Sequence, residues 1–241
     1  MVITPLEMQL NVYPPPGAFG DMMALLSHFA AKEKTLGKPE NVMLLPFGTD
    51  APQEFPRLVA PFPKVGLRLE SSGVVWVVKW LEIPTAIRSD EYAAAKRELA
   101  QEQLLGAASS LGIRITRLAS VVKWALTGTG SEGPAKWLAA RFFKELFLKA
   151  PFNRPETLEI HSHKVFTFGR FKVNSWARVK TETLLNPDPS IADNPVVTFA
   201  SDLNTPVAES TSFSQELAAD FFKETWAQHL EVRRLYLGEL S

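Results

Sequence analysis

The chain has 241 residues, which is enough for one large domain or two small ones with an ample core. Its 26 basic and 26 acidic side chains give zero formal net charge, which argues against a surface that attracts nucleic acid everywhere. Without cysteine there can be no disulfide, thiolate zinc site or cysteine nucleophile. The N-terminus does not resemble a signal peptide, and no apolar stretch approaches the ~20 residues of a membrane span. We therefore expect a soluble, cytoplasmic protein without membrane contact.

Strand-like sequence opens the chain over 6–13 and ends at the proline-rich segment 14–17. A helical pattern follows over 18–34, in which apolar side chains are spaced to form one stripe for burial on a sheet. The members of this predicted stripe are Phe19, Met22, Met23, Leu26 and Phe29.

Segments 58–70 and 74–82 are predicted as strands, because a hairpin signal at 71–73 separates them. Ser89 is a good N-cap for the next helix, with acidic residues in its first turn. That helix is expected to stop at Gly112, since glycine is the usual residue just past a helix end.

The second half begins with a predicted strand over 114–126 and the glycine-rich stretch "TGTGSEGP" at 127–134. This stretch lacks the spacings of known phosphate-binding loops, and Glu132 would repel a phosphate, so we interpret it as a plain loop. A helix is predicted to follow over 135–148.

A hairpin over 157–181 and a strand near 196–200 come next. Ser212 and Gln215, three residues apart, form a capping-box signal for a final helix. That helix is expected to close at Gly238. The order strand–helix–strands–helix thus occurs twice along the chain.

This order predicts an α+β fold of two similar halves, 1–112 and 113–241, or one continuous pseudo-symmetric domain. Sequential hairpins with interspersed helices favour a mainly antiparallel sheet with helices packed on one face. The element order resembles saddle-like tandem-repeat folds of the TATA-binding protein type and paired ferredoxin-like domains. Fold alone does not fix function.

The hairpin "LEIHSHKVFTFGRFKVNSWARVKT", residues 158–181, carries the most informative pattern. A two-residue loop at 169–170 would pair Phe168 with Phe171. In that register one face is apolar or small apart from Lys164, the other is polar, and a slip of one residue would exchange them. The predicted outer face carries Glu159, His161, His163, Val165, Thr167, Lys172, Asn174, Trp176 and Arg178.

Two interpretations of this outer face involve neither catalysis nor metal binding. It can be an ordinary solvated sheet face. It can also be a binding surface, since an exposed tryptophan among basic, amide and imidazole groups offers stacking, cationic contacts and hydrogen bonds to a protein or to single-stranded nucleic acid. The candidate binding residues are Trp176, Arg178, His161, His163, Asn174 and Lys172.

The two histidines also permit chemical interpretations. Because His-x-His on one strand face can chelate a metal ion, His161 and His163 are weak candidate ligands, with Glu159 as a third. The same histidines are weak candidates for acid–base catalysis, as in metal-independent ribonucleases. No Ser–His–Asp or paired-carboxylate order stands out elsewhere, and no cofactor is predicted.

Other polar residues are interpreted as structural. Asp202 and Asn204 in "SDLNT" are expected to end a strand and shape its turn. His28 and His229 lie in predicted helices with no partner visible nearby.

The segments "PQEFPRLVAP", "GIRITRLASVV" and "FNRPETLEIHSHKVFTFGRFKVNSWARVKT", with "DLNT" after them, resemble an uncharacterised bacterial family of about this length. That family is sporadically distributed and has no established activity. The likeness in order covers nearly the whole chain and brings no catalytic motif. It implies a compact unit of bacterial or phage origin, and the patchy distribution points towards an antitoxin or defence-system accessory role.

We therefore expect a non-catalytic binding or interaction protein. Its expected partner is another protein or a second copy of the chain, with nucleic acid as a possible partner through a local patch. The alternatives are an RNA-binding or RNA-processing protein that uses His161 and His163, and a metal-binding protein that uses the same two residues.

Overall fold

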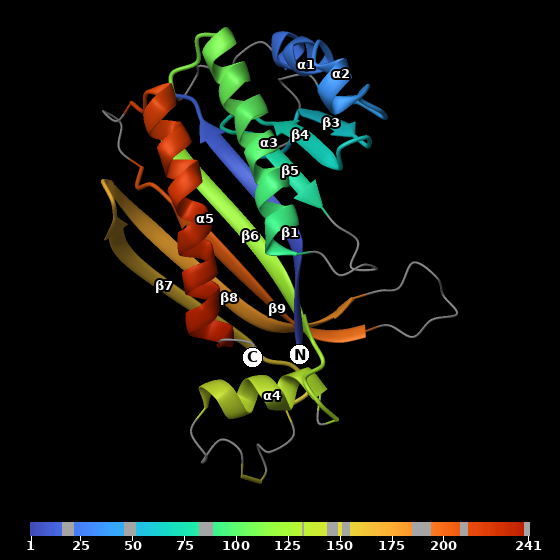
Figure 1. Ribbon diagram of the computed structural model, residues 1–241, viewed down its shortest axis with the longest axis vertical. Helices are drawn as coiled ribbons and strands as arrows, with labels where there is room; N and C mark the ends of the chain where they lie inside the picture. The colour runs from blue at the N-terminus through green and yellow to red at the C-terminus, as the bar shows by residue number, and fades with distance from the viewer. Residues whose placement is uncertain are drawn as a thin grey trace.

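The computed structural model describes residues 1–15, 22–45, 52–81, 89–131, 133–143, 149–150, 155–184, 194–207 and 212–238 (Figure 1). The strands in this part of the chain are β1 (Val2–Tyr13), β2 (Met43–Leu44), β3 (Leu58–Phe62), β4 (Leu67–Ser71), β5 (Trp76–Leu81), β6 (Arg117–Thr127), β7 (Glu159–Phe168), β8 (Phe171–Leu184) and β9 (Asn194–Asn204). The helices there are α1 (Met22–Ala30), α2 (Glu33–Leu36), α3 (Asp90–Ser110), α4 (Gly133–Phe142) and α5 (Gln215–Leu237).

The nine described strands form one sheet in the order β2-β3-β4-β5-β1-β6-β9-β8-β7, and every neighbouring pair is antiparallel. The β1–β6 pair lies in the interior of the sheet. Strands of the first half continue outward from β1, and strands of the second half continue outward from β6. The prediction of an α+β fold with an antiparallel sheet is thereby confirmed.

The described helices pack on one face of this sheet, with α3 and α5 lying across it (Figure 1). The core takes alternate residues of the central strands, for example Met8 and Leu10 of β1 and Val122 and Trp124 of β6. Each helix adds buried side chains to that same cluster: Leu25 and Phe29 of α1, Leu36 of α2, Ala100 and Leu104 of α3, Leu138 of α4, and Phe221 and Phe222 of α5. We call the opposite sheet face, on which no described helix packs, the open face.

Both long helices begin at a serine N-cap. The Ser89 hydroxyl accepts a hydrogen bond from the backbone N–H three residues on, at 3.2 Å, as predicted. In α5 the cap is Ser214, which accepts the equivalent bond at 3.1 Å, so the prediction of Ser212 as the cap was wrong. The extended backbone of Ser214 makes Gln215 the first helical residue, and α5 closes at Gly238 as expected. Among the described helices, none is long and apolar enough to cross a membrane.

The predicted strand 58–70 is in fact two strands, β3 and β4. A tight turn separates them, in which the N–H of Gly66 donates to the carbonyl oxygen of Pro63 at 3.2 Å. The positive φ of 63° at Gly66 is one that glycine adopts without strain. The sequence does carry a signal for this turn, because Pro63 and Gly66 lie at its two ends.

The predicted helix 18–34 is two short helices, α1 and α2, and its first residues, including Phe19, lie outside the described part. Leu25 and Phe29, one turn apart, are the buried residues of α1. Met23 is 52% exposed, so its place in the predicted stripe was wrong.

The second half follows the prediction more closely. Every pair of the β7–β8 hairpin lies in the predicted register, from Glu159↔Lys180 to Phe168↔Phe171. β9 runs on to Asn204 instead of ending near residue 200. For the predicted helix 135–148, α4 accounts for the first part, and 144–148 lie outside the described residues.

A buried polar cluster lies between the sheet and the long helices. His229 of α5 is fully buried, with Nδ1 2.8 Å from Ser201 Oγ and Nε2 2.9 Å from Ser120 Oγ. Arg97 of α3 donates through Nη2 to Ser120 Oγ at 3.4 Å and to the Thr225 hydroxyl. Sequence reasoning found no partner for His229 because its two serines lie on separate strands, β6 and β9.

This cluster predicts a pH-dependent stability. Burial, reinforced by the charge of Arg97, holds the pKa of His229 well below its ordinary value. Below pH ~6.5 the unfolded chain therefore binds a proton that the folded protein does not. The contribution of His229 to the free energy of unfolding is therefore fully present above that pH. Below it, this contribution falls by up to about 1.4 kcal/mol per pH unit.

Melting curves at pH 7.5, 6.5 and 5.5 check this expectation. In His229→Gln, which keeps a donor and an acceptor without a titrating proton, the loss of stability on acidification should be smaller than in the wild type. Equal pH slopes for the two proteins would contradict the assignment. Comparing slopes separates His229 from the carboxylates, which titrate in both proteins.

Candidate functional site

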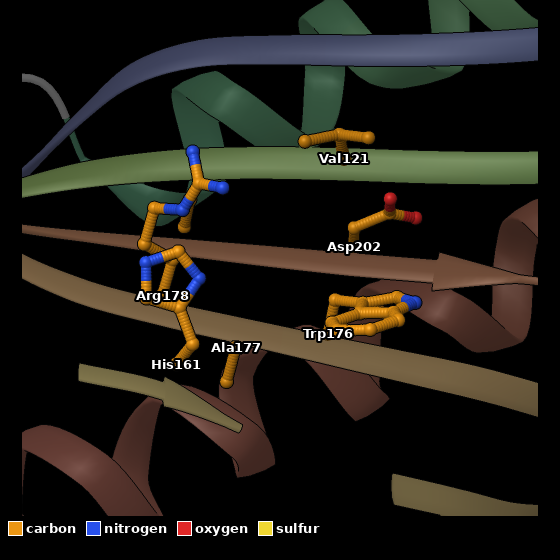
Figure 2. Close-up of a pocket in the computed structure, with 7 residues that line it drawn as sticks. Val121, His161, Trp176, Ala177, Arg178 and Asp202 are labelled. Carbon is orange, nitrogen blue, oxygen red and sulfur yellow. The ribbon is translucent and has the colours of Figure 1, made fainter. Parts of the chain in front are cut away.

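A hollow of about 380 Å³ lies on the open face, where β6, β9, β8 and β7 run side by side (Figure 2). Its lining residues are Val121 of β6, His161 of β7, Trp176, Ala177 and Arg178 of β8, and Ala200 and Asp202 of β9. The pairing explains the shape. Arg178 lies opposite Ala200, and Trp176 lies opposite Asp202. Large side chains thus stand beside small ones, which leaves a depression between them.

Trp176 forms the wall at one end of the hollow, and its side chain is 48% exposed. The imidazole of His163, its cross-strand partner, stacks on the indole with ring centroids 4.1 Å apart and planes inclined by 17°. Such a stack restricts the indole to one orientation. An exposed aromatic ring is therefore held ready for contact.

Arg178 and His161 form the other end and lie next to each other in Figure 2. Glu159 holds both, because its Oε1 lies 3.0 Å from His161 Nε2 and 3.5 Å from Arg178 Nε. All three side chains are about half exposed. Surface pairs of this kind add little stability, so their effect here is on orientation.

Asp202 lies beside Trp176 and lines the hollow (Figure 2). Its Oδ1 accepts a hydrogen bond from Asn204 Nδ2 at 3.0 Å. Burial raises the pKa of Asp202, and the Asn204 hydrogen bond and the charge of Arg117 oppose that rise. The expectation that Asp202 and Asn204 end a strand holds for Asn204, which is the last residue of β9, whereas Asp202 is paired two residues before that end. The signal that could have placed Asp202 within β9 is the alternation of Val197, Phe199 and Leu203 with smaller or polar residues up to residue 204.

The remaining predicted binding residues share the open face but do not line the hollow. Asn174 donates to Asn204 Oδ1 at 3.2 Å and so belongs to the network behind Asp202. Lys172 lies opposite Thr167, close to the turn of the hairpin. His163 contributes through its stack on Trp176.

The arrangement gives little support to metal binding or to acid–base catalysis by His161 and His163. In the part of the chain that is described, no group of three or more His, Asp or Glu side chains is placed to hold a metal ion. His161 is paired with Glu159, while His163 is stacked on Trp176. His161 and Asp202 stand at opposite ends of the hollow (Figure 2), so they do not converge on one point as an acid and a base would.

Basic side chains of the open face are interleaved with carboxylates. Glu182 binds Lys180 and, at 2.8 Å, Lys123. Although burial raises the pKa of Glu182, hydrogen bonds from Lys123, Lys180 and Thr198 lower it to about 2. On the same face, over β4 and β5, the oxygens of Glu70 lie 2.8 Å from both Arg68 and Lys79. The result is a face of mixed charge.

Comparison with known proteins gives no match, either to a family model or to a curated protein. The bacterial family that the sequence resembles therefore stays a prediction.

Proposed function

We propose that the protein is a non-catalytic binding protein, and that its open face engages a protein partner or a second copy of the chain through Trp176. The observation that carries this proposal is a half-exposed tryptophan beside a hollow, on a sheet face that no described helix covers. Tryptophan and arginine are the residue types most often found at the energetic centres of protein interfaces.

Preorganisation supports the same function. Trp176 is oriented by His163, and Arg178 by Glu159. A side chain that is already ordered loses less conformational entropy on binding, so more of its contact energy appears as affinity. Both Trp176 and Arg178 meet this condition without any contribution from the partner.

The charge pattern favours a protein over nucleic acid. A nucleic-acid surface needs a continuous basic stripe to follow the phosphates. Here Glu159, Glu70 and Glu182 each lie within ion-pair distance of basic side chains, and Asp202 lines the hollow itself. RNA binding or processing through His161 and His163 is therefore the weaker alternative.

We also propose that the two halves descend from one repeated unit. In support, each half runs strand–helix–strands–helix, starts with a strand of the β1–β6 pair and ends with a long helix. The hollow belongs to the second half only, so the two halves differ in function under this proposal. An antitoxin or defence accessory role rests on the family resemblance alone, and the genes next to its own would test it.

Affinity capture from the native host tests the proposed function. Three baits are compared: the wild type, Trp176→Ala, and Leu235→Ala, which truncates a side chain on α5 that is 62% exposed. The proposal expects the wild type and Leu235→Ala to retain one common protein that Trp176→Ala loses. Light scattering on the same three proteins measures their molar mass in solution and so shows whether the partner is a second copy of the chain.

Nuclease treatment of the extract separates the alternatives. Capture that persists after treatment belongs to a protein partner. Capture that disappears after treatment, and falls steeply as salt is raised, would instead assign the open face to nucleic acid. A protein that is lost with Leu235→Ala but kept with Trp176→Ala would place the interface on the helix side and overturn the proposal.

A further inference from the structure

A second cavity, of about 270 Å³, lies between α3 and α5. Its walls are Ala94, Arg97, Glu98 and Gln101 of α3 and Lys223 and Trp226 of α5. The two helices lie beside each other on the side of the sheet opposite the open face (Figure 1). The cavity is therefore independent of the hollow at Trp176.

Arg97 is the unusual residue of this cavity, because it is only 3% exposed. Its Nη2 donates to the hydroxyls of Ser120 and Thr225, which are neutral acceptors. Its Nε is buried without a hydrogen-bond partner. Among the residues that the structure describes, no carboxylate forms an ion pair with Arg97.

Such a guanidinium is costly to bury. A charge taken out of water needs an ion pair and a full set of hydrogen bonds, and within the described fold Arg97 has no ion pair and no hydrogen bond at Nε. Burial lowers the pKa of Arg97 to about 9, against the opposing charge of Glu98. At neutral pH the side chain is thus still cationic, and an anion bound in the cavity would balance its charge.

The surroundings of Arg97 indicate the kind of anion. A charged guanidinium pairs best with the oxygens of a phosphate or carboxylate. Because Ser120 and Thr225 accept from Nη2 of Arg97, an anion would pair with the charge of this side chain and would not form a two-bond fork with it. Lys223 adds a second cation at the wall of the cavity, and Gln101 adds an amide. Trp226 supplies an apolar wall beside them, which suits an organic group attached to the anion.

We propose that the cavity between α3 and α5 binds phosphate or a small phosphate monoester, with Arg97 as its buried anchor and Lys223 as the second cation. Glu98 lines the same cavity and its carboxylate limits the number of negative charges that the site accepts. A single phosphate group, and not a polyphosphate, is the ligand that this arrangement fits.

Isothermal titration with inorganic phosphate and, separately, with phenyl phosphate tests this site at constant ionic strength set by chloride. The expected result is one site per chain, with tighter binding of the ester because its ring contacts Trp226. Tighter binding of inorganic phosphate would assign the site to the free anion. No saturable heat with either compound would overturn the proposal.

Three variants locate the binding. Lys223→Ala should bind phosphate about tenfold more weakly, since it loses one charge-assisted contact. Lys38→Ala removes a lysine whose side chain is 77% exposed elsewhere on the surface and should bind as the wild type does. Arg97→Gln should lose the site.

The rise in melting temperature on adding phosphate serves as the second readout, because it also reports whether each variant folds. If Arg97→Gln fails to fold, the site is tested by comparing phosphate binding of Lys223→Ala with that of the control Lys38→Ala. If phosphate raises the melting temperature equally in the wild type, Lys223→Ala and Lys38→Ala, the rise is general stabilisation by salt. That result would contradict the proposed phosphate site.

Discussion

Replacing Trp176 by alanine is expected to weaken binding of the partner by about 2 kcal/mol, roughly thirtyfold. The indole is the largest exposed apolar group at the hollow, and the stack on His163 holds it in one orientation. A rigid aromatic side chain supplies contact area at a low entropic cost. Calorimetry with the captured partner measures the change.

The same variant should melt within a degree or two of the wild type, because truncation at an exposed position changes stability by about 0.5 kcal/mol or less. Val165→Ala is the matched control. Val165 is 52% exposed on the same face and does not line the hollow, so its truncation should leave affinity nearly unchanged. If Trp176→Ala and Val165→Ala lose equal amounts of affinity for the partner, Trp176 is not the energetic centre of the interface.

The opposite outcome is expected for Trp124, which lies two strands away on the helix side of the sheet. It is fully buried and packs against Phe199, Trp226 and His229, with ring centroids 5.7 to 6.4 Å apart. Trp124→Ala should lower the free energy of unfolding by about 3–5 kcal/mol, since it removes a large side chain and leaves a cavity. That is a large fraction of the ~5–15 kcal/mol that stabilises a typical domain.

Chemical denaturation measures this loss directly, and Trp176→Ala is its control. A large difference between the two tryptophan variants follows from the assignment of one side chain to the core and the other to the open face. Similar destabilisation by both substitutions would show that the open face is covered, and the hollow would then be part of a second buried layer.

The β7–β8 hairpin could be predicted residue by residue from the sequence. Its two strands are adjacent in the chain and joined by a two-residue loop, so loop length and alternation together leave a single register. The sequence alone therefore predicts that Trp176, Arg178 and His161 share one face. The same register places His163 opposite Trp176, whereas Glu159 lies opposite Lys180, so its contacts with His161 and Arg178 could not be read from the register.

The rest of the site could not be predicted, because it depends on contacts between distant segments. Asp202 and Val121 come from β9 and β6, and nothing local in the sequence says that β9 lies between β6 and β8. Arg97, Ser120 and His229 meet in the core for the same reason, from three separate elements. Periodicity specifies which face a residue occupies within its own element, whereas the neighbouring element is chosen by packing of the whole sheet.

Chemical footprinting of the histidines tests most directly whether the open face is the binding surface. With an acylating reagent, His161 and His163 should react in the free protein, because both side chains are exposed, whereas the fully buried His229 should not. Addition of the captured partner should protect His161 and His163 and leave the other reactive sites unchanged. If both histidines are unreactive in the free protein, or react equally fast with the partner bound, the open face is not where the partner binds.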